Sequence, residues 1–322
     1  MSENPNPNDP SSHDAEWQRQ TIEKLAFSAL KEQRRSRHWS IFFKSLTFIY
    51  LFVLLFYALD WVGEGATTSL NHTALIDIQG VIGNEFEVNA DDVIASLQSA
   101  YESKHTKGVI LRINSPGGSP VQAGLINDEI KRLRKIHPNI PVYAVVEDIC
   151  ASGGYYIAVA ADRIYVDKAS IVGSIGVLMD GFGFTGTMEK LGVERRLMTA
   201  GENKAILDPF SPLKEEEKQF VQQMLDQIHQ QFIDVVREGR GSRLKDNPKI
   251  FSGLFWTGES SIELGLADAL GSSEFVAREI IKEENIVDFT VHESLADRFA
   301  KRFGASIGAS LMNTLRGSAD LK

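Results

Sequence analysis

The sequence contains a single cysteine, Cys150, among its 322 residues. One cysteine excludes a disulfide within the chain and any metal site built from several thiolates. Basic residues are also scarce, because 34 Lys and Arg stand against 43 Asp and Glu and leave a formal net charge of −9. Proteins that bind nucleic acid present a strongly basic face, so this balance argues against a nucleic-acid partner.

Motifs for cofactors and metals are lacking as well. We find no P-loop, no EF-hand and no metal-binding motif, so the sequence predicts neither a cofactor nor a metal. Residues 181–186, GFGFTG, match the G-x-G-x-x-G pattern of dinucleotide-binding proteins, but no βαβ unit surrounds them and the helix pattern behind them is very short. We therefore interpret this stretch as a substrate loop in which Phe182 and Phe184 offer apolar contacts.

One long uncharged run is present. Residues 45–59, SLTFIYLFVLLFYAL, carry no charge, and the wider segment 39–62 has the length of a membrane-spanning helix. Trp39, Tyr57 and Trp61 flank the run, as aromatic anchors do at membrane interfaces. A buried core helix would show a polar face, and this segment shows none. The sequence therefore predicts one N-terminal transmembrane helix.

The charges on the two sides of this helix are unequal. Basic residues precede it and acidic residues follow it. They are Lys31, Arg34, Arg35, Arg37 and Lys44 on the N-terminal side, and Asp60 and Glu64 on the C-terminal side. The positive-inside rule then predicts a cytoplasmic N-terminus and places the remaining chain on the outer, extracytoplasmic side of the cytoplasmic (inner) membrane. No small-x-small cleavage site follows the run, so we expect an uncleaved signal anchor.

Composition and periodicity divide the chain into five parts. We expect a partly disordered cytoplasmic arm at 1–38, the transmembrane anchor at 39–62, a linker at 63–72, a catalytic domain at 73–290 and a tail or helix at 291–322. The start of the arm, 1–15, is rich in Asn, Pro, Ser and Asp, which is typical of disorder. In the tail, apolar residues recur every four positions from Leu295 to Leu311. That pattern suits a helix packed on the body or on a second subunit, or a helix lying on a membrane surface.

Strand and helix patterns alternate after the linker. Strand patterns occupy 72–82, 108–113, 141–148, 163–167 and 193–199, and helical patterns occupy 89–103, 119–136, 152–161 and 213–238. Alternation of this kind predicts parallel βαβ units with helices packed on the sheet. The predicted fold class is α/β.

Two of the strand patterns lead into glycines, and the residues at these two places are suited to catalysis. Ser152 follows one strand pattern and begins a helical one, where free backbone amides favour an oxyanion. Gly117 and Gly118 end another strand pattern in a turn, and the carboxyl ends of parallel strands meet at one sheet edge. The amides of Gly118 and Gly153 are then expected to form an oxyanion hole beside a nucleophilic Ser152. A tight turn with an incidental hydroxyl is the alternative.

The sequence offers two kinds of general base. None of the seven histidines lies in a recognisable catalytic motif, although triad members are spatial neighbours and a histidine base stays open. A lysine can replace histidine where desolvation favours its neutral amine. Lys204 is followed by Ala205, Ile206, Leu207 and Phe210, which makes it a candidate base, although most lysines are solvated surface charges.

Four stretches together resemble the signal peptide peptidase A family. They are SPGG at 115–118, ASGGYYIA at 151–158, AADRIYVDKASIVGSIGV at 160–177 and AGENKAILDPF at 200–210. The family consists of membrane-bound serine proteases with a crotonase/Clp-protease-like fold, and the resemblance runs from about Ala74 to Ile280. The match is to the single-length bacterial members, with one protease unit per chain.

The resemblance implies a role for five residues. Ser152 would be the nucleophile, Lys204 the general base, and Ser174 a hydroxyl that holds the lysine ammonium, while Gly118 and Gly153 would donate the oxyanion-hole amides. The serine and lysine would come from adjacent subunits of a homo-oligomeric ring. Cys150 would be buried in a core strand and would point away from the site.

The function expected from these features is a membrane-anchored Ser/Lys endopeptidase. It would degrade remnant signal peptides and other apolar peptides at the membrane. A catalytically silent membrane scaffold is one alternative, and intact Ser152 and Lys204 count against it. A crotonase-like acyl-CoA hydratase or isomerase is another, but such an enzyme would use acidic residues and would not need a membrane anchor.

Overall fold

The computed structural model describes residues 10–58 and 70–291. Contacts divide the chain into two compact units, one of Met1–Glu64 with Glu293–Lys322 and one of Gly65–His292. Most of the expected linker and the amphipathic pattern from Leu295 to Leu311 lie outside the described residues.

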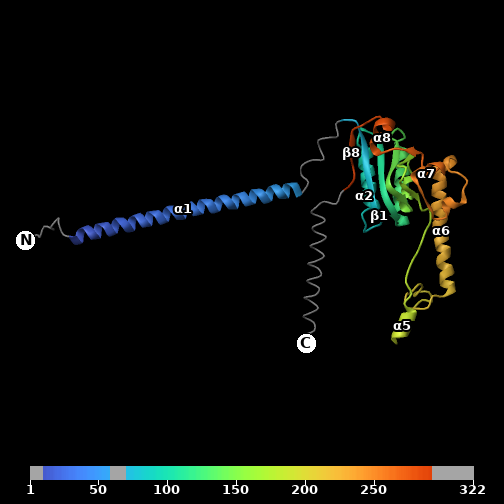
Figure 1. Ribbon diagram of the computed structural model, residues 1–322, viewed down its shortest axis with the longest axis horizontal. Helices are drawn as coiled ribbons and strands as arrows, with labels where there is room; N and C mark the ends of the chain where they lie inside the picture. The colour runs from blue at the N-terminus through green and yellow to red at the C-terminus, as the bar shows by residue number, and fades with distance from the viewer. Residues whose placement is uncertain (1–9, 59–69, 292–322) are drawn as a thin grey trace, which may run out of the picture. The chain divides into compact units, whose positions relative to one another are not determined.

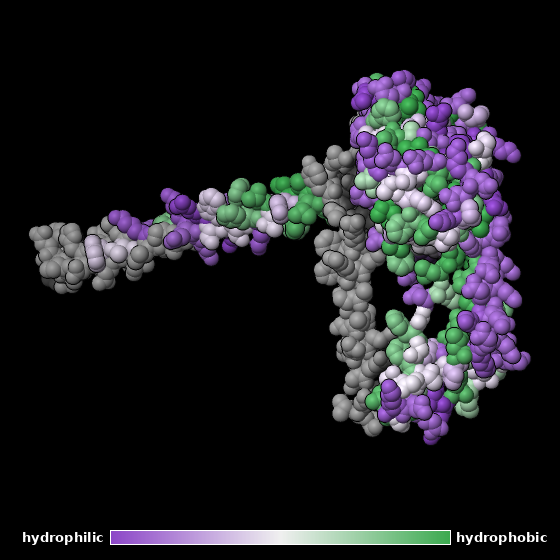
Figure 2. All heavy atoms as spheres, turned by 45° about the vertical axis from the view of Figure 1, so that its right-hand side comes forward, coloured by the Kyte–Doolittle hydropathy of each residue, from purple (hydrophilic) through white to green (hydrophobic). Residues whose placement is uncertain are grey.

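The described part of the first unit is one continuous helix, α1, Pro10–Ala58 (Figure 1). Its segment Lys31–Leu55 is long and apolar enough to cross a membrane, and none of it is buried by protein. Apolar side chains gather along the C-terminal half of α1 (Figure 2). The helix also includes residues 10–15, which were expected to be disordered; Pro10 fits a first helical turn, where its missing N–H breaks no bond.

The second unit is built on an eight-stranded sheet. Its main path runs β6-β5-β3-β2-β1-β8, with β4 paired to β3 and β7. The strands are β1 His72–Ile82, β2 Thr106–Gly118, β3 Val142–Ala151, β4 Arg163–Val166, β5 Ile171–Gly173, β6 Phe255–Thr257, β7 Ala269–Leu270 and β8 Ile286–Asp288. Every pairing is parallel except that of β5 with β6. The predicted parallel α/β class is confirmed.

Helices connect the strands and cover the sheet. They are α2 Ala90–Glu102, α3 Pro120–Ile136, α4 Gly153–Ala158, α5 Thr185–Leu191, α6 Glu215–Arg240, α7 Gly258–Glu263 and α8 Ser273–Phe275, with 3₁₀ turns η1 Gly241–Arg243 and η2 Pro248–Phe251 and a π-turn η3 Val276–Ile281. Local chemistry starts them, since the side chain of Asn89 accepts from Asp92 N in α2 and that of Ser119 accepts from Gln122 N in α3. Both helices begin where their capping residues predict.

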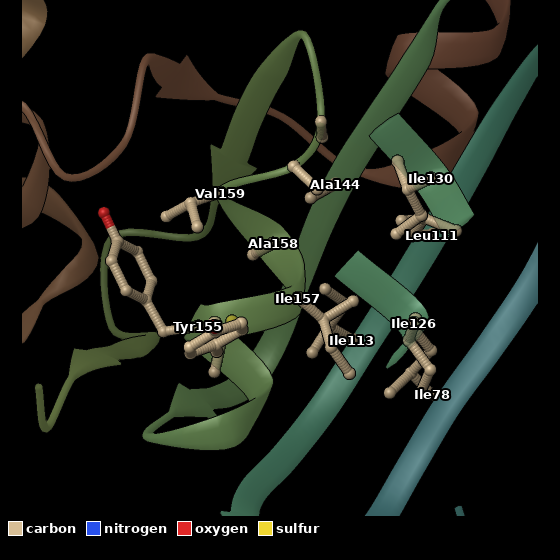
Figure 3. Close-up of a cluster of buried hydrophobic side chains, with 14 of the residues drawn as sticks. Ile78, Leu111, Ile113, Ile126, Ile130, Ala144, Tyr155, Ile157, Ala158 and Val159 are labelled. Carbon is tan, nitrogen blue, oxygen red and sulfur yellow. The ribbon is translucent and has the colours of Figure 1, made fainter. Parts of the chain in front are cut away.

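The main core lies between the sheet and helices α2, α3 and α4. Ile78, Leu111, Ile113 and Ala144 from the strands meet Ile126 and Ile130 from α3 and Ile157 from α4 (Figure 3). All seven side chains are fully buried. This packing anchors α4 directly behind Ser152. A smaller cluster on the opposite face includes Leu75, Ile110 and Val145 against η3.

One predicted strand is wrong. Residues 193–199 form no β-structure and follow α5 as an irregular segment. They belong to an arm, residues 177–214, that runs from the end of β5 to the start of α6 and extends away from the sheet (Figure 1). No strand edge borders this segment in the described structure, so its apolar alternation has nothing to pair with.

Candidate active site

Ser152 joins the end of β3 to the start of α4 in an unusual backbone conformation. Its φ is +51° and its ψ is −120°. For a residue with a side chain, such a backbone conformation costs roughly 1–3 kcal/mol of free energy, and it persists only where the surrounding structure imposes it. Here Ser152 N donates to Gly173 O at 2.9 Å, and Tyr156 N donates to Ser152 O at 2.9 Å. The strained conformation is therefore held from both sides.

The sequence predicted a turn at Gly117 and Gly118, but β2 continues through Gly118, and this strand end touches the backbone around Ser152. A Cβ placed on Gly117, whose φ is +102°, would lie 2.7 Å from both Gly153 N and Ser152 Cβ. A Cβ placed on Gly153 would lie 3.3 Å from Gly118 N. The first approach leaves no room for a side chain at Gly117, and the second is a tight contact that a side chain at Gly153 would strain. The structure thus brings Gly118 and Gly153 together beside Ser152, as their positions at neighbouring strand ends predicted.

Ser174 lies at the next strand end. Ala151 pairs with Gly173 in register, so Ser152 and Ser174 follow directly on neighbouring parallel strands. Ser174 also has a positive φ, +53°, and its N–H donates to Leu254 O at 2.7 Å. Two serines in left-handed backbone conformations therefore stand side by side at one sheet edge.

These residues open into a cleft of about 620 Å³. Its walls include Ser152, Gly153, Gly118 and Ser174, together with apolar side chains from α4, α6 and the segment after β5. The apolar members are Tyr156, Val177, Leu178, Ile228 and Phe232. A site with the half-buried Ser152 hydroxyl, two nearby backbone glycines and an apolar wall suits the binding and attack of an apolar peptide.

Lys204 is not part of this cleft. It lies in the turn 201–207 of the arm and is exposed to solvent, and its backbone N–H donates to Gly201 O at 3.2 Å. The single chain thus brings together four of the five predicted site residues and leaves the fifth on the arm.

The arm closes on itself through aromatic and charged contacts. Phe184 N donates to Pro209 O at 2.7 Å, and the rings of Phe184 and Phe210 stack at 5.4 Å. Arg195 lies 5.2 Å from the Phe210 ring centroid and 3.1 Å from the Asp208 carboxylate. GFGFTG belongs to this arm, and α5 behind it has seven residues, so the context of a dinucleotide site is absent from the described structure.

Comparison with known proteins identifies the family. The family model described as Peptidase family S49 matches residues 134–287. A Synechocystis protein named "Putative protease slr0021" is 32% identical over 208 residues, which cover 65% of this chain and 73% of that protein. The chain belongs to peptidase family S49. The family expected from the four motifs is thereby confirmed.

In other relatives the matched region is a small part of the relative's own length. The Arabidopsis thaliana "Serine protease SPPA, chloroplastic" is 34% identical over 183 residues, 56% of this chain and 27% of that protein. A Brucella melitensis protein named Na(+)/H(+) antiporter NhaA is 51% identical over 175 residues, 54% of this chain. This chain spans 24% of that protein's length, so the name carries no argument about the activity here.

Sequence reasoning did not identify His229 as a polar side chain in the cleft of this S49 chain. His229 from α6 lines the cleft, and its Nε2 lies 3.1 Å from Ile175 O, to which it donates. His229 therefore ties α6 to the residue that follows Ser174. No local motif marks His229, because its place in the cleft depends on how α6 packs.

Cys150 behaves as expected for a core residue. It is fully buried in β3, and burial raises the pKa of its thiol. A buried thiol that keeps its proton is a poor nucleophile, so Ser152 is the better candidate. Among the residues that the structure describes, no cluster of His, Cys, Asp and Glu could hold a metal ion.

Proposed function

We propose that this S49 chain is a membrane-anchored serine endopeptidase with Ser152 as nucleophile. The observation that carries the proposal is the strained Ser152 at the floor of the cleft, with Gly118 and Gly153 against it. A nucleophile held on a sharp strand-to-helix turn presents its Oγ to a bound carbonyl without reorganisation.

The proposed reaction is acyl transfer to Ser152. A neutral Lys204 amine takes the proton of Ser152 Oγ as the oxygen attacks the scissile carbonyl. The amides of Gly118 and Gly153 donate to the oxyanion of the tetrahedral intermediate. The lysine then protonates the leaving amine, and water hydrolyses the acyl-enzyme. Ser174 accepts a hydrogen bond from the lysine ammonium and orients it.

Lys204 would reach Ser152 from a neighbouring subunit. Within one chain it is exposed and outside the cleft, and a solvated ammonium does not act as a base near neutral pH. The arm carries exposed apolar side chains, including Leu178, Phe182 and Met198, that a second copy could cover. Burial against that copy would desolvate the lysine and favour its neutral amine. A homo-oligomeric ring would satisfy both requirements.

Membrane attachment and substrate class belong to the same proposal. The apolar part of α1 and the basic residues before it support an anchor with a cytoplasmic N-terminus and a catalytic domain on the outer side of the inner membrane. The apolar cleft wall and the closeness of the bilayer favour remnant signal peptides and similar apolar peptides as substrates.

Separate and mixed variants test this proposal. In the full chain in detergent, Ser152→Ala and Lys204→Ala are each expected to lower the rate of apolar peptide cleavage at least about 1000-fold. A fluorophosphonate should label Ser152 in the wild-type chain and should not label Ser152→Ala. Wild-type cleavage rates in both variants would refute the dyad.

Mixing the two inactive variants tests the shared site. If each site takes Ser152 from one subunit and Lys204 from its neighbour, co-assembled variants recover part of the wild-type rate. No recovery, in mixed oligomers whose formation is verified by two affinity tags, would refute the shared arrangement.

A further inference from the structure

The pairing of β1 with β2 is irregular just before Gly117. Where the register shifts, β1 has one residue, Gly80, opposite two residues of β2, Ser115 and Pro116. This is a β-bulge whose extra residue lies in β2, and such a residue is taken out of the strand ladder. Opposite the bulge, Gly80 has a φ of +104°.

Ser115 is one of the two residues of this bulge. Ser115 is fully buried, and its Oγ donates to Gly80 O at 2.6 Å. The same Oγ accepts from Gly117 N at 3.1 Å. A hydroxyl has one proton to donate and lone pairs to accept, so both roles are filled by backbone. One oxygen thus links Gly80 of β1 to Gly117 at the end of β2.

The end of β2 has a second fixed point, which follows Gly118. Ser119 N donates to Ile82 O at 2.7 Å, and a Cβ on Gly118 would lie 2.0 Å from the same oxygen. Gly118 therefore sits between two attachments, Ser115 before it and Ile82 after it. Gly117 and Gly118 also pair with β1, so loss of the Ser115 hydroxyl would loosen this strand end without detaching it. Glycine opposes the resulting small rotations of the peptide only weakly.

We propose that Ser115 is a positioning residue for the oxyanion hole. Its hydroxyl fixes the Gly117 amide so that the Gly118 N–H is aimed where the negative oxygen of the tetrahedral intermediate develops. Ser115 does not touch the substrate. The inference rests on the proposed serine peptidase function and deepens it, since it assigns the preorganisation of one oxyanion donor to a buried side chain.

The matched control is Ser96, a second buried serine that makes the same two kinds of bond. Ser96 Oγ donates to Asp92 O at 2.8 Å and accepts from Val291 N at 2.9 Å, and its exposure is 1%. It lies in α2 and does not line the cleft. Ser115→Ala and Ser96→Ala therefore remove equivalent hydroxyls, one bonded to Gly117 at the end of β2 and one in α2.

The test measures cleavage kinetics and inhibitor binding for the full chain in detergent. Removing a whole oxyanion donor costs about 100- to 1000-fold in kcat, and misdirecting one should cost less. Ser115→Ala is expected to lower kcat about 10- to 100-fold with little change in KM. A peptide aldehyde, whose adduct with Ser152 mimics the tetrahedral intermediate, should lose affinity by a similar factor. Ser96→Ala should keep the wild-type kcat and aldehyde affinity.

Several outcomes would overturn the inference. Equal kcat losses in Ser115→Ala and Ser96→Ala would show a structural role, and so would a loss in Ser115→Ala that leaves aldehyde affinity unchanged. If Ser115→Ala does not fold, Ser115→Cys keeps a side chain of similar shape with a weaker donor, and an unchanged kcat there refutes the inference. A wild-type chain that no fluorophosphonate labels at Ser152 would refute the proposed function itself, and the inference with it.

Discussion

Ser152 and Lys204 differ in their surroundings, because Ser152 is packed into the body of the catalytic domain and Lys204 lies on an exposed arm. Around Ser152, Gly153 and Tyr155 are buried, and backbone hydrogen bonds reach the serine from β5 and α4. Around Lys204, the arm 177–214 contains no buried residue, and α5 contributes none. The first region is packed within one chain, and the second exposes apolar side chains to solvent.

This difference has a physical consequence for the proposed mechanism. A nucleophile gains from preorganisation, which a packed core supplies within the monomer. A lysine base needs a dry surrounding, and a narrow arm with solvent on every side cannot supply one. Assembly of subunits would thus desolvate the lysine and favour its neutral amine, while the conformation of Ser152 would stay the same. Substitutions should therefore act differently in the two regions.

The largest expected effect is that of Gly117→Ala. Its new Cβ would meet Gly153 N and Ser152 Cβ at 2.7 Å, with φ at +102°. We expect kcat/KM to fall by at least about 1000-fold, which corresponds to about 4 kcal/mol of transition-state stabilisation. Gly192→Ala in the arm is the control, since Gly192 also has a positive φ, +66°, but nothing within 4 Å.

The Gly192 control should lose only about 1 kcal/mol of stability from backbone strain. Its fluorophosphonate labelling rate should equal that of the wild type. Similar labelling rates for Gly117→Ala and Gly192→Ala would contradict the idea that close backbone contact builds the site.

The second effect concerns an ion pair in the body. Arg240, 1% exposed, donates to Asp268 at 2.8 and 3.0 Å and to Gly265 O at 2.7 Å. Asp268→Asn leaves the guanidinium without its counter-charge and should cost about 3–5 kcal/mol in the free energy of unfolding. Urea unfolding of the full chain in detergent measures this loss.

Acid should act on the same pair. Burial alone would raise the pKa of Asp268, but hydrogen bonds and the charges of Arg240 and Arg243 outweigh it and hold the pKa below its ordinary value. The pair's contribution is therefore complete above the pKa of an unfolded aspartate and is lost as pH falls through the lower folded value. Wild-type and Asp268→Asn stabilities should converge in that acidic range. A constant difference there would contradict the assignment.

A smaller effect on stability is expected in the arm. Phe210→Ala removes the stack on Phe184 and the contact with Arg195, but Phe210 is itself 40% exposed. The free energy of unfolding should change by about 1 kcal/mol. Peptide cleavage should fall far more, about 10-fold or beyond, because the arm carries Lys204. An unchanged cleavage rate would contradict a role of the arm in catalysis.

The smallest effect is expected for an exposed ion pair. Arg196 lies 3.1 Å from Glu194, and both side chains are largely solvated. Glu194→Gln should change the free energy of unfolding by less than about 0.5 kcal/mol. A loss above 1 kcal/mol would mean that this part of the arm is buried in an assembled state.

Local chemistry was enough to predict much of the body. The helices after Asn89 and Ser119 start at their caps, and β2 and β3 lie where apolar runs predicted strands. The turn expected at Gly117 and Gly118 is instead the end of β2, because these residues pair with β1. The convergence of Gly118 and Gly153 followed from strand parallelism alone. The strand predicted at 193–199 was wrong because an apolar alternation forms a strand only beside another strand edge. His229 was missed because α6 reaches the cleft through packing, which no spacing encodes.

The sequence by itself determined the alternation of strands and helices from β1 to α4, the apolar segment of α1 and the glycines beside Ser152, because caps, periodicity and backbone freedom act over a few residues. The tertiary structure alone decided that Ser152 takes a positive φ, that Ser115 links Gly80 to Gly117, and that Lys204 stays outside its own chain's cleft. These outcomes depend on contacts between residues far apart along the chain, such as Gly80 and Ser115, which are 35 positions apart. The geometry of these contacts is set by the way the helices pack on the sheet.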